Sequence, residues 1–148
     1  MDKACRIAAG ALFTNADKVL LVHKTYGHGW DVPGGYVDVG ESPASACERE
    51  LHEELGINRR VARLLVQDWA PTDSEGDKIL YLFDCGGLGE DEDHIRLDNV
   101  EIDRFEWVRI DDLAQFVIPR LERRLTNAYL AQTTDTTLYL EHGLPRAP

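Results

Sequence analysis

The alternation of apolar and polar positions divides the chain into strands and two helical regions. Apolar runs bounded by turn-forming residues predict strands over Cys5–Phe13, Val19–His23, Val61–Trp69, Lys78–Asp84 and Glu101–Val108. Lys78–Asp84 is almost continuously apolar, which is typical of a strand that is buried on both faces. Apolar residues recur at helical spacing in two places, from Pro43 to Leu55 and from Pro119 to Ala131.

The order of these elements indicates the fold class. Strands lie before and after the first helix, and the second helix follows them. This order predicts an α+β fold, with mixed β-sheets and helices packed outside them. No repeat or low-complexity linker interrupts the 148 residues, so we expect a single domain over residues 1–148. Beyond Thr133 the pattern predicts one more short strand, Thr137–Leu140, and Asp111 is expected to cap a helical turn that begins at Asp112.

The first helix has clear start and stop signals. Ser42 can accept hydrogen bonds from the first free N–H groups, and Pro43 suits the first helical position. Gly56 is suited to the left-handed residue that ends a helix. Before the helix, the alternating segment Tyr36–Val39 predicts a short strand that follows the Gly34–Gly35 pair.

This helix sorts its side chains onto two faces. One apolar stripe, expected to face the core, consists of Ala44, Cys47, Leu51 and Leu55. Glu50, Glu53 and Glu54 lie at positions i, i+3 and i+4, so their carboxylates share an adjacent face. Mg²⁺ and Mn²⁺ prefer oxygen ligands, and such an ion turns the repulsion of clustered carboxylates into attraction. An isolated E-x-x-E-E would be interpreted as a solvated acidic face. Only the residues around it can distinguish such a face from a metal site.

Charge and cysteine content narrow the classes of partner. Sixteen basic against 27 acidic residues leave a net charge of −11, which disfavours binding to nucleic acid or to an anionic membrane. A small phosphorylated substrate would then need a metal to offset its charge. Three scattered cysteines, Cys5, Cys47 and Cys85, predict reduced thiols in core or strand positions. Without an apolar run near 18 residues or a signal peptide, a cytoplasmic protein is expected.

The spacing around the acidic face matches a known motif. Nine residues fit the Nudix box, G-x5-E-x7-R-E-U-x-E-E-x-G-U with U a bulky aliphatic: Gly35, Glu41, Arg49, Glu50, Leu51, Glu53, Glu54, Gly56 and Ile57. At average residue usage, the seven fixed positions coincide by chance on the order of once in 10⁹ windows. The chain therefore resembles the MutT-like Nudix hydrolases. That resemblance implies an α/β/α sandwich in which the box forms a loop–helix–loop beside the substrate cleft.

The resemblance also implies roles for individual residues. Glu50, Glu53 and Glu54 would hold Mg²⁺ or Mn²⁺, with the carbonyl of Gly35 as a further ligand. Arg49 would pair with Glu41 or Glu53 and orient the ligand glutamates. The general base lies either within the box or on a later loop glutamate, for which Glu101 is the candidate.

The predicted substrate is a small nucleotide, namely a nucleoside diphosphate linked to another moiety such as ribose or a sugar. Pro71 lies close to the position of a proline that the ADP-ribose group carries, which favours ADP-ribose slightly. The alternative is a MutT-like pyrophosphohydrolase of nucleoside triphosphates. A non-catalytic ligand-binding module is disfavoured because all the box glutamates are present, and an isoprenoid isomerase because Cys47 lies on the apolar stripe. Whether the protein is a homodimer is left open.

Other residues allow two interpretations each. Arg120, Arg123 and Arg124 could bind phosphate, but a solvated basic helix face is favoured. His28 is interpreted as an exposed loop residue between two glycines. Tyr26, Trp30 and Trp69 could stack a nucleobase, although packing within the protein is favoured for each of them. The acidic run Glu90–Asp93 is expected to be a solvated loop.

Overall fold

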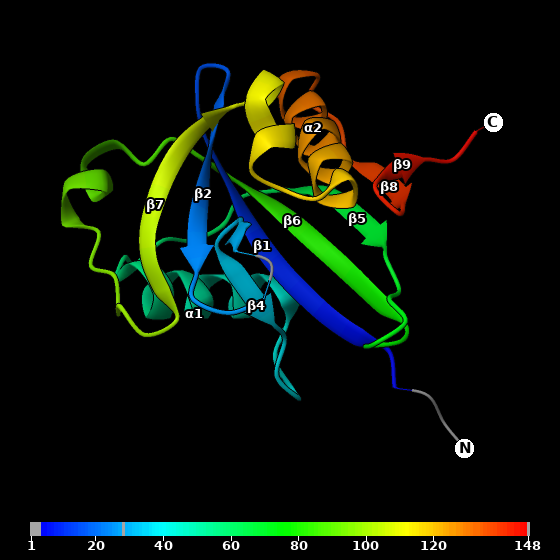
Figure 1. Cartoon of the computed structure of the whole chain (residues 1–148), viewed down its shortest axis with the longest axis horizontal. Helices are drawn as coiled ribbons and strands as arrows, with labels where there is room; N and C mark the ends of the chain where they lie inside the picture. Colours follow the sequence, from blue (N-terminus) through cyan, green and yellow to red (C-terminus); the bar gives the residue numbers. More distant parts are fainter. Residues whose placement is uncertain (1–3, 28, 148) are drawn as a thin grey trace.

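The longest strand, β1 (Arg6–Asn15), connects the two parts of the β structure in the computed structural model (Figure 1). It pairs in parallel with β6 (Lys78–Gly86) and antiparallel with β4 (Gly34–Tyr36). Its last two residues pair antiparallel with β2 (Lys18–Lys24). Because β4 lies on β1, the start of the Nudix-like motif is anchored to the centre of the fold.

The remaining strands extend the sheet on both sides. β2 also pairs antiparallel with β3 (Trp30–Asp31) and with β7 (Ile102–Arg109). On the other side, β5 (Leu64–Trp69) pairs antiparallel with β6 and parallel with β8 (Leu138–Glu141), and β8 pairs antiparallel with β9 (Leu144–Pro145). The helices are α1 (Pro43–Leu55) and α2 (Pro119–Thr133), with 3-10 helices η1 (Gly89–His94) and η2 (Ile110–Gln115).

Alternation along the strands produces two hydrophobic cores. Leu12 and Leu21 lie in the core that is covered by α2, whereas Phe13 and Leu20 lie in the core that is covered by α1. Successive side chains of a strand point to opposite faces, so neighbouring residues contribute to different cores. Mixed β structure with a helix on each side confirms the predicted α+β architecture (Figure 1).

The segment before α1 differs from the prediction. The expected strand Tyr36–Val39 ends at Tyr36, and Val39 is fully exposed. The cause is a turn, since the Glu41 N–H donates to the Asp38 carbonyl at 3.1 Å and the Glu41 carboxylate accepts the Asp38 N–H at 3.0 Å. The strand predicted from Val61 begins only at Leu64, and the N–H of Val61 donates instead to the carboxylate of Glu48.

Three smaller expectations were also wrong. The acidic run Glu90–Asp93 is largely exposed as expected, but it lies within the 3-10 helix η1 and not in a loop. Asp111 lies inside η2 and makes no cap hydrogen bond, because the helix already begins at Ile110, whose N–H donates to the carbonyl of Asp17. Cys5 is exposed and precedes β1, whereas Cys47 and Cys85 are buried as expected.

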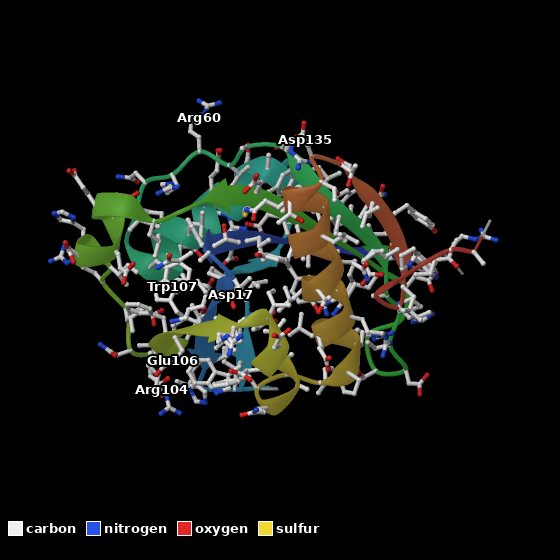
Figure 2. The ribbon with its side chains drawn as sticks, turned by 90° about the horizontal axis from the view of Figure 1, so that it is seen from above. Asp17, Arg60, Arg104, Glu106, Trp107 and Asp135 are labelled. Atoms are coloured by element: carbon white, nitrogen blue, oxygen red, sulfur yellow. The ribbon has the colours of Figure 1, made fainter. Side chains whose placement is uncertain are left out.

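The structure describes residues 4–27 and 29–147. His28, predicted to be an exposed loop residue, and residues 1–3, at which no signal peptide is expected, lie outside this range. Within it, no helix is long and apolar enough to cross a membrane. Figure 2 shows Arg104 and Glu106 of β7 pointing outward at one edge of the molecule, and Arg60 extending away from its body.

Candidate active site

The termini of α1 fix the rotation of the helix that carries the glutamates. The Ser42 hydroxyl accepts the Ser45 N–H at 3.1 Å, and Pro43 occupies the first turn. At the other end, Gly56 has a φ of 69° and its N–H donates to the carbonyl of His52 at 3.0 Å. Leu51 and Leu55 are fully buried on the apolar stripe. The glutamates are thereby turned toward β4.

The three glutamates of the acidic face lie in three different environments. Glu53 is exposed, and Glu50 is half-buried against β4. A Cβ atom placed on Gly35 would lie 2.5 Å from a carboxylate oxygen of Glu50, so only glycine leaves room for this approach. Glu54 is 2% exposed, and its carboxylate accepts the N–H of Gly34 at 2.7 Å. The helix therefore presents its carboxylates along the backbone of Gly34 and Gly35.

Burial changes the protonation of this face. Burial raises the pKa of Glu54 to about 8, against the opposing effects of Lys24 and the Gly34 N–H. Burial also raises the pKa of Glu50, which Arg49 partly offsets. For Lys24, burial acts to lower the pKa, but Asp31 and the two glutamates outweigh it and the pKa is raised. Lys24 is therefore a cation held beside the buried carboxylates.

Arg49 joins the loop before α1 to the acidic face. Its Nε and Nη2 donate to the two carboxylate oxygens of Glu41 at 2.8 and 3.0 Å, and its Nη1 donates to Glu50 at 3.1 Å and to Glu53 at 3.2 Å. The carbonyl of Tyr36 accepts a further bond from Nη2. The hydrogen bonds from Arg49 contribute most to lowering the pKa of Glu41, to about 2. Both pairings expected from the sequence, with Glu41 and with Glu53, are present.

The chemistry of the donor set suits a hard divalent cation. The acidic face and the backbone of Gly35 offer only oxygen ligands, which Mg²⁺ and Mn²⁺ prefer. Arg49 lies between Glu50 and Glu53 in this structure. In the part of the chain that the structure describes, no three His, Cys, Asp or Glu side chains are already grouped to hold a metal ion. The ligand types nevertheless fit the ion.

A cavity of about 690 Å³ opens beside these residues. Four of the predicted site residues line it: Gly35, Glu50, Glu54 and Glu101. The lining residues that the sequence analysis did not assign to the site are Lys24, Tyr36, Ala70, Thr72, Glu75, Lys78, Ile118, Leu121 and Arg124, among others. Among the residues that the structure describes, neither Glu53 of the acidic face nor its partner Arg49 lines the cavity.

Glu101 is positioned by a turn before β7. The carboxylate of Asp98 accepts the N–H groups of Val100, Glu101 and Ile102 at 3.0 to 3.1 Å, and these bonds lower the pKa of Asp98. The carbonyl of Glu101 accepts the N–H of Thr25 at 2.9 Å. The exposed side chain of Glu101 thus reaches the cavity from a loop whose backbone is tied at two points.

The predictions for the aromatic residues and for the arginines of α2 have different outcomes. The aromatic residues Tyr26 and Trp30 line the cavity, whereas Trp69 pairs within the sheet on β5. The solvated basic face expected for α2 is wrong for Arg124, which is 7% exposed and bonded to Asp68. In the sequence, the i, i+4 spacing of Arg120 and Arg124 places the two arginines on one face of the helix. The spacing does not reveal that this face borders a cavity.

Comparison with known proteins agrees with this geometry. The model of the NUDIX domain matches residues 5–129. An RNA pyrophosphohydrolase of Rickettsia typhi is 26% identical, with 89% of this chain and 91% of the relative aligned. A MutT protein from Methanosarcina mazei Go1 superposes with a TM-score of 0.72 at 24% identity, over 91% of this chain and 98% of that one.

A second solved structure has a different name but a similar fold. An ADP-ribose pyrophosphatase from Streptococcus suis 89-1591 superposes with a TM-score of 0.67 at 22% identity, over 93% of this chain and 99% of that one. At these identities the structural likeness shows the fold, while the family model covers most of the chain and includes the whole box. The chain therefore belongs to the Nudix family and is a hydrolase of phosphorus-containing anhydrides.

Proposed function

We propose that the protein hydrolyses the phosphoanhydride of a small nucleoside diphosphate conjugate, ADP-ribose or a nucleotide sugar. The products would be a nucleoside monophosphate and a phosphorylated remainder. The observation that carries this proposal is the cavity of about 690 Å³ with the Glu50 and Glu54 carboxylates in its wall. Its volume is that of a site for a small ligand, and it is lined by two of the three carboxylates that would hold a phosphate-binding metal.

Glu50, Glu53 and Glu54 would hold Mg²⁺ or Mn²⁺, with the carbonyl of Gly35. The ion, when bound, lowers the pKa of a water ligand and neutralises charge on the phosphates. Arg49 acts on the glutamates and is a positioning residue, because its guanidinium holds Glu50 and Glu53 in a fixed relation to Glu41. Lys24 adds a positive charge near Glu54 and Glu50.

Glu101 is the proposed general base outside the box. Its carboxylate lies in the cavity wall on a different element from the metal-binding helix, so it can accept a proton from a water that attacks between them. The hydrogen bonds of Asp98 and Thr25 hold its backbone in place. If Glu101 does not serve this role, the base lies among the box glutamates.

Aromatic residues in the cavity support a nucleotide conjugate as the substrate. Tyr26 is 58% exposed at the cavity, and Trp30 packs edge-on against His23 and Phe116. An exposed ring of this kind can stack on a nucleobase, a contact worth about 1–3 kcal/mol. The fold similarity to the ADP-ribose pyrophosphatase of Streptococcus suis and the position of Pro71 point in the same direction.

The second candidate is MutT-like pyrophosphohydrolysis of a nucleoside triphosphate, which the names of other relatives support. The Rickettsia typhi relative is named an RNA pyrophosphohydrolase, and the structural neighbour from Methanosarcina mazei a MutT protein. The net charge of −11 disfavours contact with an RNA body, so a free nucleoside triphosphate is the better form of this alternative. The cytoplasmic location stays a prediction, and the oligomeric state stays open.

One experiment separates the two candidates. The purified protein is incubated with ADP-ribose, nucleotide sugars, nucleoside triphosphates and a 5′-triphosphorylated RNA, each with Mg²⁺ and with Mn²⁺, and the products are identified by mass. We expect nucleoside monophosphate from the diphosphate conjugates. Release of pyrophosphate from triphosphates, with no cleavage of any conjugate, would make the second candidate correct.

A further inference from the structure

A second charged group lines the cavity, and the hydrolytic site does not use it. Arg120 and Arg124 lie one turn apart on α2, and both are lining residues. They come from the helix that covers the other core, not from the box helix. In a protein with a net charge of −11, two arginines at one cavity wall are a local exception.

Arg124 is buried, but its guanidinium is only partly used. Its Nε donates to the carboxylate of Asp68 at 2.6 Å, and its two Nη groups make no hydrogen bond within the described residues. Among those residues, no buried side-chain nitrogen or oxygen atom lacks a partner. The Nη groups are therefore not sealed in protein, and because Arg124 lines the cavity, they reach it there. The four N–H donors of the two Nη groups are then available to a ligand.

Arg120 has no carboxylate partner within the described part of the chain. Its Nη2 donates to the carbonyl of Pro71 at 2.7 Å and to Nδ1 of His142 at 2.9 Å, both neutral acceptors in that arrangement. Its Nε and Nη1 remain available at the half-buried cavity wall. Asp68 neutralises Arg124, so Arg120 leaves one positive charge at this wall without a counter-ion.

The turn between β8 and β9 holds both arginines in place. The second carboxylate oxygen of Asp68 accepts the N–H of Gly143 at 3.0 Å, and the adjacent His142 accepts from Arg120. A Cβ atom on Gly143 would lie 2.7 Å from the carbonyl of Arg120, so the turn fits closely against α2. This contact orients the guanidinium groups before any ligand arrives, which reduces the entropy lost on binding.

We propose that Arg120 and Arg124 form an anion-binding subsite that takes a phosphate group of the substrate, separate from the phosphate at the box glutamates. Guanidinium groups bind phosphate oxygens through paired, charge-assisted hydrogen bonds. The subsite requires a substrate with at least two phosphate groups, and it rests on the proposed function only for the identity of that substrate. Asp68 and the His142–Gly143 turn are positioning elements.

Binding of inorganic pyrophosphate without divalent metal tests the subsite directly. Isothermal titration calorimetry compares the natural protein with Arg120→Met, which keeps most of the side-chain stem and removes the charge. We expect the affinity to fall by about 10-fold or more, the effect of losing a charge-assisted hydrogen bond. Wild-type affinity in the Arg120→Met variant, or no measurable binding to the natural protein, would overturn the proposal.

Arg123→Met is the matched control. Arg123 is in the same helix and donates to the carbonyl of His142 at 2.8 Å, but it is not among the lining residues. Both variants lose one positive charge and one contact to the turn, so similar melting temperatures are expected. The affinity of Arg123→Met for pyrophosphate should stay within about twofold of the natural value. An equal loss in both variants would contradict a specific subsite.

The subsite and the proposed function can fail separately. Glu53→Gln should hydrolyse poorly while it binds pyrophosphate normally without metal, and Arg120→Met should raise KM far more than it lowers kcat. If no diphosphate conjugate is cleaved but pyrophosphate binding still depends on Arg120, the subsite stands and the proposed substrate is wrong. If conjugates are cleaved and Arg120→Met leaves KM unchanged, the substrate stands and the subsite is wrong.

Discussion

Glu53 and Glu54 are neighbours in the sequence but differ in what their removal would do. Glu53 is exposed and shares the Nη1 group of Arg49, whereas Glu54 is buried with a pKa raised to about 8 and bonded to the Gly34 N–H. Burial makes the ionised carboxylate of Glu54 unfavourable, and the Gly34 N–H and the nearby Lys24 offset only part of this cost. Removing the charge of Glu54 is therefore expected to affect stability as well as catalysis, whereas removing the charge of exposed Glu53 is expected to affect catalysis alone.

Substitution by glutamine is expected to remove the catalytic effect at both positions. Glu53→Gln and Glu54→Gln keep the side-chain volume and a carbonyl acceptor but remove one ligand charge. Turnover should fall by at least ~10²-fold, a loss of about 2.7 kcal/mol of barrier lowering. Steady-state kinetics over a range of Mg²⁺ concentrations measures this. Glu106→Gln is the control, because Glu106 is exposed on β7 and is not among the residues that line the cavity. Normal rates in both variants at limiting Mg²⁺ would place the metal elsewhere.

Glu101 is expected to matter for rate and much less for binding. Glu101→Gln keeps the backbone turn held by Asp98 but removes the proton acceptor. If Glu101 is the base, kcat should fall by ~10²-fold or more, the size of a general-base contribution, while KM changes little. A profile of kcat against pH for both proteins is the measurement. Unchanged turnover across the pH range would return the base to the box glutamates.

At the scale of elements, the packing of β4 depends on two adjacent glycines, of which Gly34 faces β1 and Gly35 faces α1. A Cβ atom on Gly34 would lie 2.2 Å from the carbonyl oxygen of Ala9, and Gly34 has a φ of 150°. A Cβ atom on Gly35 would instead meet the end of the Glu50 side chain. Backbone atoms of β1 cannot move aside, but a carboxylate can rotate away.

These neighbours predict opposite results for the two alanine variants. Gly35→Ala should displace the Glu50 carboxylate, so that turnover falls by ~10-fold or more while the melting temperature changes little. Gly34→Ala should force β4 away from β1 and destabilise the protein by about 1–3 kcal/mol, as overpacking does. Thermal unfolding and kinetics on the same samples distinguish them. A Gly35→Ala variant with full activity would argue against a ligand role for Glu50 and Gly35.

The elements differ in how far the sequence predicted them. The bounds of α1 were correct to the residue, because Ser42, Pro43 and Gly56 are local signals that act within one turn. The strand expected over Tyr36–Val39 failed because the carboxylate of Glu41, three residues after Asp38, closes a turn with it. Alternation alone contains no information about such a contact.

Local spacing predicted part of the site, and tertiary structure determined the rest. The box spacing located the carboxylates on one helix face and the two partners of Arg49. Burial of Glu54 could not be predicted, since it depends on β4 passing over the helix. Arg124 was assigned to solvent because helical spacing does not reveal that Asp68, 56 residues earlier, lies opposite it.

At the scale of the whole molecule, the charge distribution limits which polyphosphates can approach. The net charge is −11, and four cationic residues, Lys24, Lys78, Arg120 and Arg124, line the cavity together with six acidic ones. Charges on the outer surface act over a Debye length of about 8 Å at physiological salt, so they repel a long polyanion along its length. A compact substrate with all its phosphates inside the cavity avoids most of this repulsion.

Salt should therefore separate a small substrate from RNA. For a 5′-triphosphorylated RNA of ten nucleotides, kcat/KM should rise as KCl increases from 20 to 200 mM, because salt screens the repulsion between RNA and protein. A nucleotide-sized substrate should change less or in the opposite direction. Proteins that bind nucleic acid through basic surfaces show a steep loss of affinity over the same range. Such a loss with RNA would reveal a basic track on this protein and favour the activity named in its Rickettsia relative.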